Sequence, residues 1–315
     1  EITTRLVGSE MCIRDRKNKD KKKTRYSNIY PNRYAFVYIG PATILMIGMC
    51  LFPVLVLFYN SFTDFSLLRP MTRFIGFRNF ERILFRNPDY LQSLGRTVIY
   101  ASCTVTLQII IGFFLALIFQ VRMPFRKTTR SIMILPMVAS PIAVSFLWTI
   151  MLHPTSGVVN YLLEMMHLPT SLWISSSKTA LASVIMVDVW KNTPYVFLIF
   201  SSAMTAMPHD LFEAAVVDGA SFWQMIHRIL LPLLKPVFTV VLMLKLVDGL
   251  KAFDLLYSMT SGGPVTATQT VNVMIYKSAF VRYEMGLASA QAVILYIIIF
   301  AVATFIVRIG GMNFD

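Results

Sequence analysis

Long apolar stretches recur along this chain and alternate with shorter polar segments. Four of them contain no Asp, Glu, Lys or Arg, and each exceeds the ~20 residues that a bilayer-crossing helix needs. These four stretches are Tyr34–Thr63, Thr97–Val121, Ser131–Leu163 and Met285–Val307. Two further stretches, Thr179–Met207 and Val237–Met259, are apolar but interrupted by a few charges. The pattern predicts an all-α polytopic membrane protein with six transmembrane helices.

The composition agrees with this prediction and excludes a soluble domain. Of the 315 residues, 56% are hydrophobic and only 14% are charged, against roughly 25% charged in soluble domains. The three cysteines (Cys12, Cys50 and Cys103) and four scattered histidines have no disulfide or metal-site spacing. We therefore predict no metal site.

The net charge of +13 is unevenly placed, because ten of the 29 Lys and Arg precede Tyr34. We divide the chain into a basic cytoplasmic tail, residues 1–33, a six-span domain, residues 34–308, and a C-terminal end, residues 309–315. The first fifteen residues, EITTRLVGSEMCIRD, fit poorly with the rest of the chain. We expect residues 1–15 to be translated adapter sequence and exclude them from fold reasoning.

Orientation follows from the bias of Lys and Arg toward cytoplasmic loops. The basic tail and the cluster Arg122, Arg126, Lys127 and Arg130 predict that both termini face the cytoplasm of a cell-membrane protein. One external segment disagrees with this bias. It contains Arg69, Arg73, Arg78, Arg82, Arg86 and Arg96. These arginines alternate with Phe and Leu, so we interpret the segment as amphipathic and lying on the membrane surface.

Prolines inside two predicted spans suggest kinked helices. Pro136 and Pro141 fall in the third span and Pro194 in the fourth, where proline frees backbone carbonyls and bends a helix. Such helices suit a protein with an opening cavity, although each proline is equally compatible with a plain packing role.

The segment Asp210–Pro236 separates two apolar stretches without resembling an ordinary loop. Asp210 followed by Glu213 has the spacing of a capping box, which predicts a short helix over Glu213–Asp218. Gly219 offers the left-handed conformation that ends a helix. We call residues 208–236 the coupling loop.

A second capping box in the coupling loop, Ser221 with Gln224, predicts that a new helix begins there. Trp223, Ile226 and Leu230 recur at helical spacing along it. Two short helices separated by a glycine would form a rigid knob suited to docking on a partner. The alternative is an ordinary helical connector.

The coupling loop resembles the EAA loop of ABC-importer permeases, the membrane subunits of ATP-driven uptake systems. The likeness is carried by Glu213-Ala214-Ala215, Asp218-Gly219-Ala220, Trp223 and Ile229-Leu230-Leu231-Pro232. In that family the loop sits in a cleft of the cytoplasmic ATPase. The resemblance therefore implies that Glu213, Ala214, Ala215, Asp218, Gly219 and Ala220 form an ATPase-docking surface, with Trp223 packing behind it. His227 and Ile226 stand where aromatic residues are common in the family.

A second resemblance, in Leu250–Thr268, points to the carbohydrate-type permeases. Phe253-Asp254, Tyr257, Thr260, Gly262-Gly263-Pro264 and Thr268 are similar to their FD…Y…T.GGP…T signature. Phe74–Phe80, Trp190–Tyr195 and Gly286–Ala290 continue the likeness, which covers residues 35–308. It implies the maltose- and glycerol-phosphate-type group and the first of its two unlike permease subunits.

Charged residues inside the predicted membrane spans are candidates for function, since each costs at least ~2.5–3.5 kcal/mol at mid-bilayer. They are Asp188 and Lys191 in the fourth span, and Lys245, Asp248, Lys251 and Asp254 in the fifth. The last four alternate in sign at i,i+3 spacing, so neighbouring pairs can neutralise each other. Two interpretations remain open: structural ion pairs, or a polar translocation path.

The chain contains none of the nucleotide or hydrolase motifs GxxxxGK[ST], HExxH and GxSxG. We therefore expect no enzyme and no bound cofactor, with ATP and Mg on a separate ATPase. The resemblance implies a sugar-uptake permease with a second homologous permease, two ATPase copies and an extracellular solute-binding protein as partners. The alternatives are an ion-coupled secondary transporter, an ABC importer for another solute such as glycerol phosphate, and a membrane scaffold.

Overall fold

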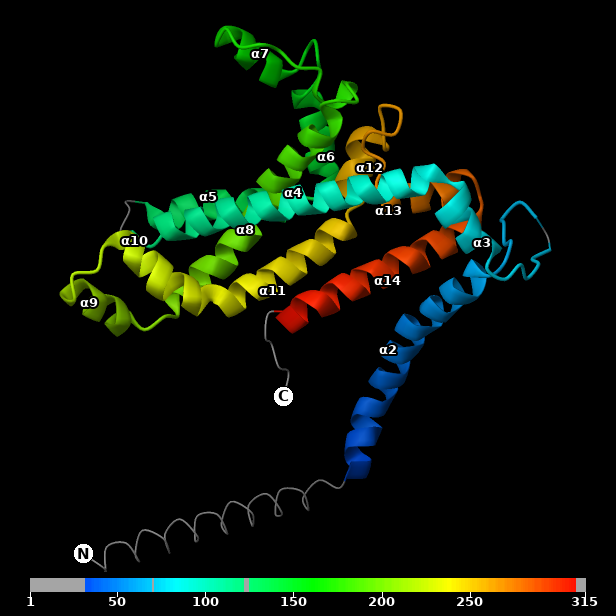
Figure 1. Cartoon of the computed structure of the whole chain (residues 1–315), viewed down its shortest axis with the longest axis horizontal. Helices are drawn as coiled ribbons and strands as arrows, with labels where there is room; N and C mark the ends of the chain where they lie inside the picture. The colour runs from blue at the N-terminus through cyan, green and yellow to red at the C-terminus, as the bar shows by residue number, and fades with distance from the viewer. Residues whose placement is uncertain (1–31, 70, 122–124, 310–315) are drawn as a thin grey trace, which may run out of the picture. The chain divides into compact units, whose positions relative to one another are not determined.

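The computed structural model describes residues 32–69, 71–121 and 125–309 (Figure 1). The predicted tail and most of the C-terminal end lie outside these ranges. The long helices are α2 (Asn32–Ser61), α4 (Pro88–Ile118), α5 (Arg126–Val138), α6 (Pro141–Met151), α8 (Ala180–Thr205), α11 (Leu231–Leu250) and α14 (Met285–Ile309). The short ones are α3 (Arg78–Glu81), α7 (Val158–Met165), α9 (His209–Val217), α10 (Phe222–Met225), α12 (Asp254–Thr260) and α13 (Val271–Tyr276).

The chain divides into two units, residues 1–59 and residues 60–315. The described part of the first unit belongs to α2, whose apolar stretch Val37–Ser61 has a mean hydropathy of 2.3 over its most apolar window. Because α2 is 30 residues long, it spans ~45 Å at 1.5 Å per residue and can cross a bilayer. The second unit contains all the other helices described.

The structure confirms a helical membrane protein but not the full count of six spans. Within the described ranges, four helices are long and apolar enough to cross a membrane, or five if the bent pair α5–α6 is one span. Helix α8 covers the fourth predicted span and is long enough to cross a membrane, at 26 residues, but is not among these helices. Asp188, Lys191 and Asn192 in its middle lower its hydropathy.

The third predicted span, Ser131–Leu163, is broken at Pro141, one of the two prolines expected to kink it. The chain turns by 96° between α5 and α6, where Ala139 and Ser140 adopt ψ angles of 140° and 135°. Pro141 is the cause, because proline excludes the helical conformation from the residue before it and begins the next helix readily. Pro136 lies inside α5 and Pro194 inside the uninterrupted α8.

The fifth predicted span, Val237–Met259, is also interrupted. Its helix α11 ends at Leu250, and α12 begins at Asp254 after a short break. In the other direction α11 continues without a turn into the π-helical turn Ile226–Leu230 and α10. The coupling loop is therefore joined rigidly to this span.

Small residues allow α4 to pack closely against two neighbours. A Cβ atom added to Gly112 of α4 would lie 2.8 Å from Val196 Cγ1 of α8. A Cβ on Gly249 of α11 would lie 3.1 Å from the Cα of Ala101 in α4. In membranes such small residues bring helix backbones together and let dispersion forces hold them.

We expect Gly112→Ala to destabilise the α4–α8 interface by ~1–3 kcal/mol, because the added methyl group overpacks a filled contact. Gly95→Ala is the matched control, since it lies on α4 and a Cβ there meets no atom within 4 Å. Thermal unfolding of the two purified variants in one detergent measures the difference. Equal midpoints for Gly112→Ala and the parent would contradict the close packing.

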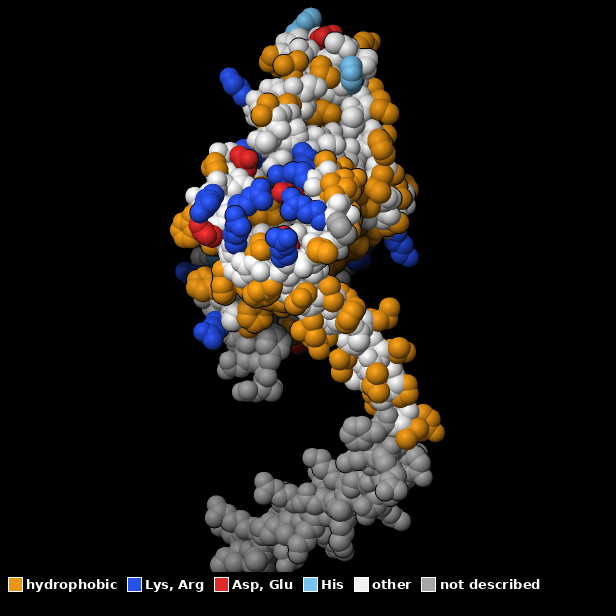
Figure 2. All heavy atoms as spheres, turned by 90° about the vertical axis from the view of Figure 1, so that its right-hand side faces the viewer, with side chains coloured by type: hydrophobic (Ala, Val, Ile, Leu, Met, Phe, Trp, Pro, Cys, Tyr) orange, Lys and Arg blue, Asp and Glu red, His pale blue; other side chains and the backbone are white. Residues whose placement is uncertain are grey.

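Segments predicted to share one side of the membrane lie together in the second unit. At the end near α3 (Figure 1), Leu67 N donates to Tyr283 O at 3.3 Å and Gly286 N to Phe65 O at 2.8 Å. Arginine side chains gather over this end (Figure 2). At the other end, Met133 and Phe212 pack against the buried Phe119 and Ile226. This grouping agrees with the predicted alternation of spans.

Candidate functional site

A cavity of about 210 Å³ lies among α4, α8 and α11, next to α6 and α12. We call it the charged cavity. Its polar lining consists of Tyr100, Thr104, Gln108, Asp188, Lys191, Asn192, Lys245, Asp248 and Asp254. Five of the six residues proposed for a translocation path or for pairing thus lie around one space. Lys251 is the sixth, and it does not line the cavity.

Asp188 is fixed by two amide groups. Its Oδ2 accepts a hydrogen bond from Gln108 Nε2 at 2.9 Å, which links α8 to α4. Its Oδ1 accepts from Asn192 Nδ2 at 2.8 Å, one turn further along α8. Neither Gln108 nor Asn192 was among the site residues predicted from the sequence. The sequence signal for this contact was Gln108 itself, a polar amide side chain in the middle of a charge-free apolar stretch.

Lys191 and Lys245 are buried, with 8% and 5% of their surfaces exposed. The Nζ of Lys245 lies 5.6 Å from the ring centroid of Tyr195, a cation–π distance. Within the described ranges, no carboxylate lies within 4.0 Å of either amine. The two cations therefore face the charged cavity without a direct ion pair.

The predicted ladder of ion pairs along the fifth span is wrong at two of its three steps. Lys251 and Asp248 approach to 4.0 Å with both side chains more than half exposed. Lys245 does not pair with Asp248, nor Lys251 with Asp254, among the ion pairs of the described residues. The helix ends at Leu250, so Asp254 starts a separate helix and leaves the i,i+3 register.

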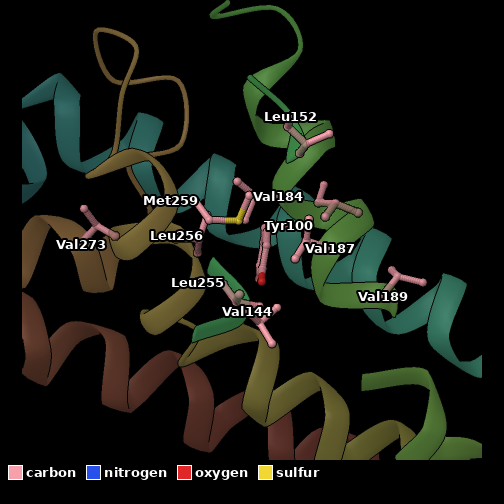
Figure 3. Packing of buried hydrophobic residues seen from close by; sticks show 11 residues of the cluster. Tyr100, Val144, Leu152, Val184, Val187, Val189, Leu255, Leu256, Met259 and Val273 are labelled. Atoms are coloured by element: carbon pink, nitrogen blue, oxygen red, sulfur yellow. The ribbon is translucent and has the colours of Figure 1, made fainter. Parts of the chain in front are cut away.

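An apolar cluster borders the charged cavity (Figure 3). The side chain of Tyr100 is fully buried among Val144 of α6, Val187 of α8 and Leu256 of α12. Since Tyr100 lines the cavity as well, the cluster forms a dry wall at one side of the polar space. The cluster thereby joins α4, α6, α8 and α12 beside the charged cavity.

The residues of the FD…GGP resemblance form a compact turn beside this cavity. The rings of Phe253 and Tyr257 stack at 5.2 Å, and Tyr276 packs 4.6 Å from Tyr257. The hydroxyls of Thr260 and Thr268 are 2.6 Å apart. Gly262 between them has φ +84°, which favours glycine. The contacts give the signature a structural role, and Phe253 also lines the charged cavity.

In the coupling loop the break at Gly219 is confirmed. Gly219 has φ +76°, Gly219 N donates to Val216 O at 3.1 Å, and Ala220 N donates to Ala215 O at 2.9 Å. These two bonds are the Schellman pattern of a helix C-terminus. The second capping box is also confirmed, because Ser221 and Gln224 exchange side-chain to backbone bonds.

The first capping box is wrong. Helix α9 begins at His209, Pro208 occupies the N-cap position, and no side chain caps it. Asp210 therefore lies in the first turn, where its negative charge interacts favourably with the helix dipole. The predicted short helix over Glu213–Asp218 is in fact the second half of α9.

The candidate docking residues form an uncovered ridge on α9 and α10. Glu213, Ala214, Asp218 and Gly219 are exposed, Ala220 partly so, and only Ala215 is buried. Trp223 is 62% exposed and stacks on His227 at 6.2 Å. Apolar Val216, Val217 and Phe222 beside them are also exposed. Within the described residues, neither the Glu213 nor the Asp218 carboxylate makes a hydrogen bond or ion pair.

These features define a multi-pass helical membrane protein with a polar cavity between its helices and a projecting helical loop. Residues 108–310 match the family described as "Binding-protein-dependent transport system inner membrane component", and the chain belongs to that family. It is a membrane transport subunit and not an enzyme.

Curated relatives and a solved structure cover most of the chain. It is 29% identical over 286 residues to the trehalose/maltose transport system permease protein MalF of Thermococcus litoralis, covering 90% of this chain and 95% of the relative. It is 32% identical over 273 residues to the inner membrane ABC transporter permease protein YcjO of Escherichia coli, covering 85% and 91%. A bacterial alginate ABC transporter, solved with an alginate pentasaccharide-bound periplasmic protein, shares the fold with a TM-score of 0.80 at 22% identity, covering 91% and 99%.

Proposed function

We propose that this chain is one of two permease subunits of an ATP-driven sugar importer and forms half of its translocation pathway. Its family membership and its similarity to a trehalose/maltose permease support a sugar as the transported solute. A second homologous permease, two cytoplasmic ATPases and an extracellular solute-binding protein complete the transporter. ATP and Mg bind the ATPases, and both termini of this chain face the cytoplasm.

The observation that carries the proposal is the uncovered ridge of the coupling loop. Small side chains at Ala214 and Ala220 allow a partner to approach closely, and unpaired carboxylates of Glu213 and Asp218 can accept hydrogen bonds from it. The apolar side chains of Val217 and Trp223 are exposed there and gain by being covered. Because α10 runs into α11 without a turn, movement of a docked ATPase would reach the charged cavity directly.

The charged cavity is the proposed part of the pathway. Asp188, Lys191, Lys245, Asp248 and Asp254 line it, and their charges are tolerated at membrane depth only where they face water, a solute or each other. Lys251 lies at the exposed end of α11 and pairs with Asp248. Alternating access would open this cavity to one side of the membrane at a time.

Cysteine labelling tests both the docking surface and the orientation. In a variant lacking Cys12, Cys50 and Cys103, a single cysteine replaces Ala214, Thr128 or His167, of which all three are exposed. We expect an impermeant maleimide to modify positions 214 and 128 only in inside-out vesicles and position 167 only in intact cells. Assembly with the ATPase should protect position 214 and leave position 128 reactive.

Two results would contradict the proposal in different ways. Modification of position 214 from outside intact cells would reverse the orientation. Equal labelling of position 214 with and without bound ATPase would exclude the coupling loop as the docking surface. An ion-coupled secondary transporter predicts the second result, because it needs no ATPase.

A further inference from the structure

Five arginines surround a second, larger cavity at the end of the second unit near α3. They are Arg69, Arg78, Arg82, Arg86 and Arg282, and the cavity measures about 770 Å³. We call it the arginine basin. Figure 2 shows Lys and Arg side chains in blue gathered around a few acidic ones in red on this face. The charged-cavity pathway proposed above uses none of these residues.

The arginine basin has more positive than negative charge. Three carboxylates, of Asp64, Glu81 and Glu284, line it together with the five arginines. Arg82 pairs with Glu284 at 3.3 Å and Arg86 with Glu81 at 2.7 Å. One oxygen of Asp64 accepts the backbone N–H of Arg73 at 2.6 Å.

The other three arginines of the basin form no ion pair among the described residues. Arg69, Arg78 and Arg282 are exposed, and in the described ranges none has a carboxylate within 4.0 Å. Arg282 donates to the Ser278 hydroxyl at 2.7 Å, which orients its guanidinium. Three guanidinium groups therefore line one concave space without forming an ion pair among the described residues.

The position of the basin matches the depth of lipid headgroups. A single residue separates Arg86 from the start of α4, and Glu284 directly precedes α14. Both helices are long and apolar enough to cross a membrane. Helix α14 thus begins at its rim, and α4 begins there too, although the charge-free stretch of α4 starts only at Thr97. Leu68, Leu84 and Phe85 between the arginines are exposed, Phe85 by 83%. Such apolar side chains at this level suit contact with acyl chains.

We propose that the arginine basin binds the phosphate of an anionic phospholipid headgroup. A guanidinium matches phosphate oxygens with two parallel hydrogen bonds, and clustered basic side chains at a membrane surface attract anionic headgroups. The concave shape and the exposed apolar rim favour a lipid over the acidic surface of a soluble protein. The inference depends neither on the transported solute nor on which face of the membrane the basin occupies.

The test is a titration of the purified transporter, in detergent with phosphatidylcholine, by phosphatidylglycerol, with bound lipid counted by native mass spectrometry. We expect the variant Arg69→Gln, Arg78→Gln, Arg282→Gln to bind phosphatidylglycerol about 100-fold more weakly, at about fivefold per arginine or ~1 kcal/mol each. Arg73→Gln should bind as the parent does, because Arg73 is exposed in the same segment but does not line the basin.

Arg78→Gln alone, with an expected loss of about fivefold, keeps the test decisive if the triple variant folds poorly. Unchanged phosphatidylglycerol binding by a folded Arg78→Gln variant would overturn the proposal. So would inorganic phosphate binding to the parent as tightly as phosphatidylglycerol, since the acyl chains would then contribute nothing. Loss of solute-binding-protein association with unchanged lipid binding would assign the basin to a protein partner instead.

Discussion

We expect Gly219→Val to leave the chain inserted in the membrane and to reduce both transport-coupled ATP hydrolysis and copurification of the ATPase. Gly219 has φ +76°, a conformation that costs a β-branched residue ~1–3 kcal/mol. The chain can relieve this strain only by changing the turn, which would misaim α9 relative to α10. A loss of that size corresponds to about 5- to 150-fold weaker coupling.

The cause of this effect is the backbone and not crowding. A Cβ added at Gly219 meets no atom within 4 Å, so the strain of the left-handed backbone is the expected cost of valine. Asparagine is therefore an informative control, because it also adds a side chain but adopts left-handed backbone readily. We expect Gly219→Asn to retain most of the coupled ATPase activity.

Reconstituted transporters carrying either variant provide the measurement, with and without the solute-loaded binding protein. The sugar affinity of the isolated binding protein should be the same for all preparations and serves as an internal check. Full coupled hydrolysis by the Gly219→Val transporter would mean that the coupling loop is only a connector. Equal losses for valine and asparagine would assign the effect to the added side chain.

Local signals in the sequence predicted the coupling loop well. Gly219, Ser221 and Gln224 act on their own neighbours, so their roles can be inferred without tertiary structure. The start of α9 was predicted wrongly, because the spacing of Asp210 and Glu213 placed Asp210 at the N-cap position. The chain places Pro208 there, with φ −60° and ψ 124°, and moves Asp210 into the helix.

The two broken spans show where such inference ends. An apolar stretch such as Ser131–Leu163 has no charged residue to indicate a turn of 96°, although Pro141 was identified as a point of bending. In the fifth span, the break after Leu250 depends on contacts distant in sequence. One of them is the Asn272 side chain, which donates to Leu250 O at 3.0 Å.

Most charged residues of the charged cavity were predicted from the sequence, but the side chains that they contact were not. Asp188 and Lys245 were identified because charges are rare in membrane spans, and the structure places both around one space. Their contacts across helices are with an amide or a ring: Gln108 for Asp188 and Tyr195 for Lys245. Uncharged partners stand out less than charges in a hydropathy pattern, so charge spacing alone did not identify these contacts.

Asp188→Ala should be far more damaging than Asp248→Ala, although both carboxylates line the charged cavity. Removing Asp188 leaves the amides of Gln108 and Asn192 without their acceptor, at ~1–3 kcal/mol for each group left buried. It also removes the only carboxylate of α8, the helix that carries the buried Lys191.

Asp248 differs because its side chain is 60% exposed and its pair with Lys251 is long, at 4.0 Å. Such exposed pairs contribute ~0.2–1 kcal/mol. We therefore expect Asp248→Ala to unfold at nearly the parent temperature in detergent, and Asp188→Ala to unfold well below it with little assembled transporter. Asp188→Asn keeps one acceptor oxygen and should fall between them in stability. If Asp188→Asn assembles normally but loses sugar uptake, the carboxylate acts in the pathway, whereas parental stability and uptake in Asp188→Ala would refute both roles.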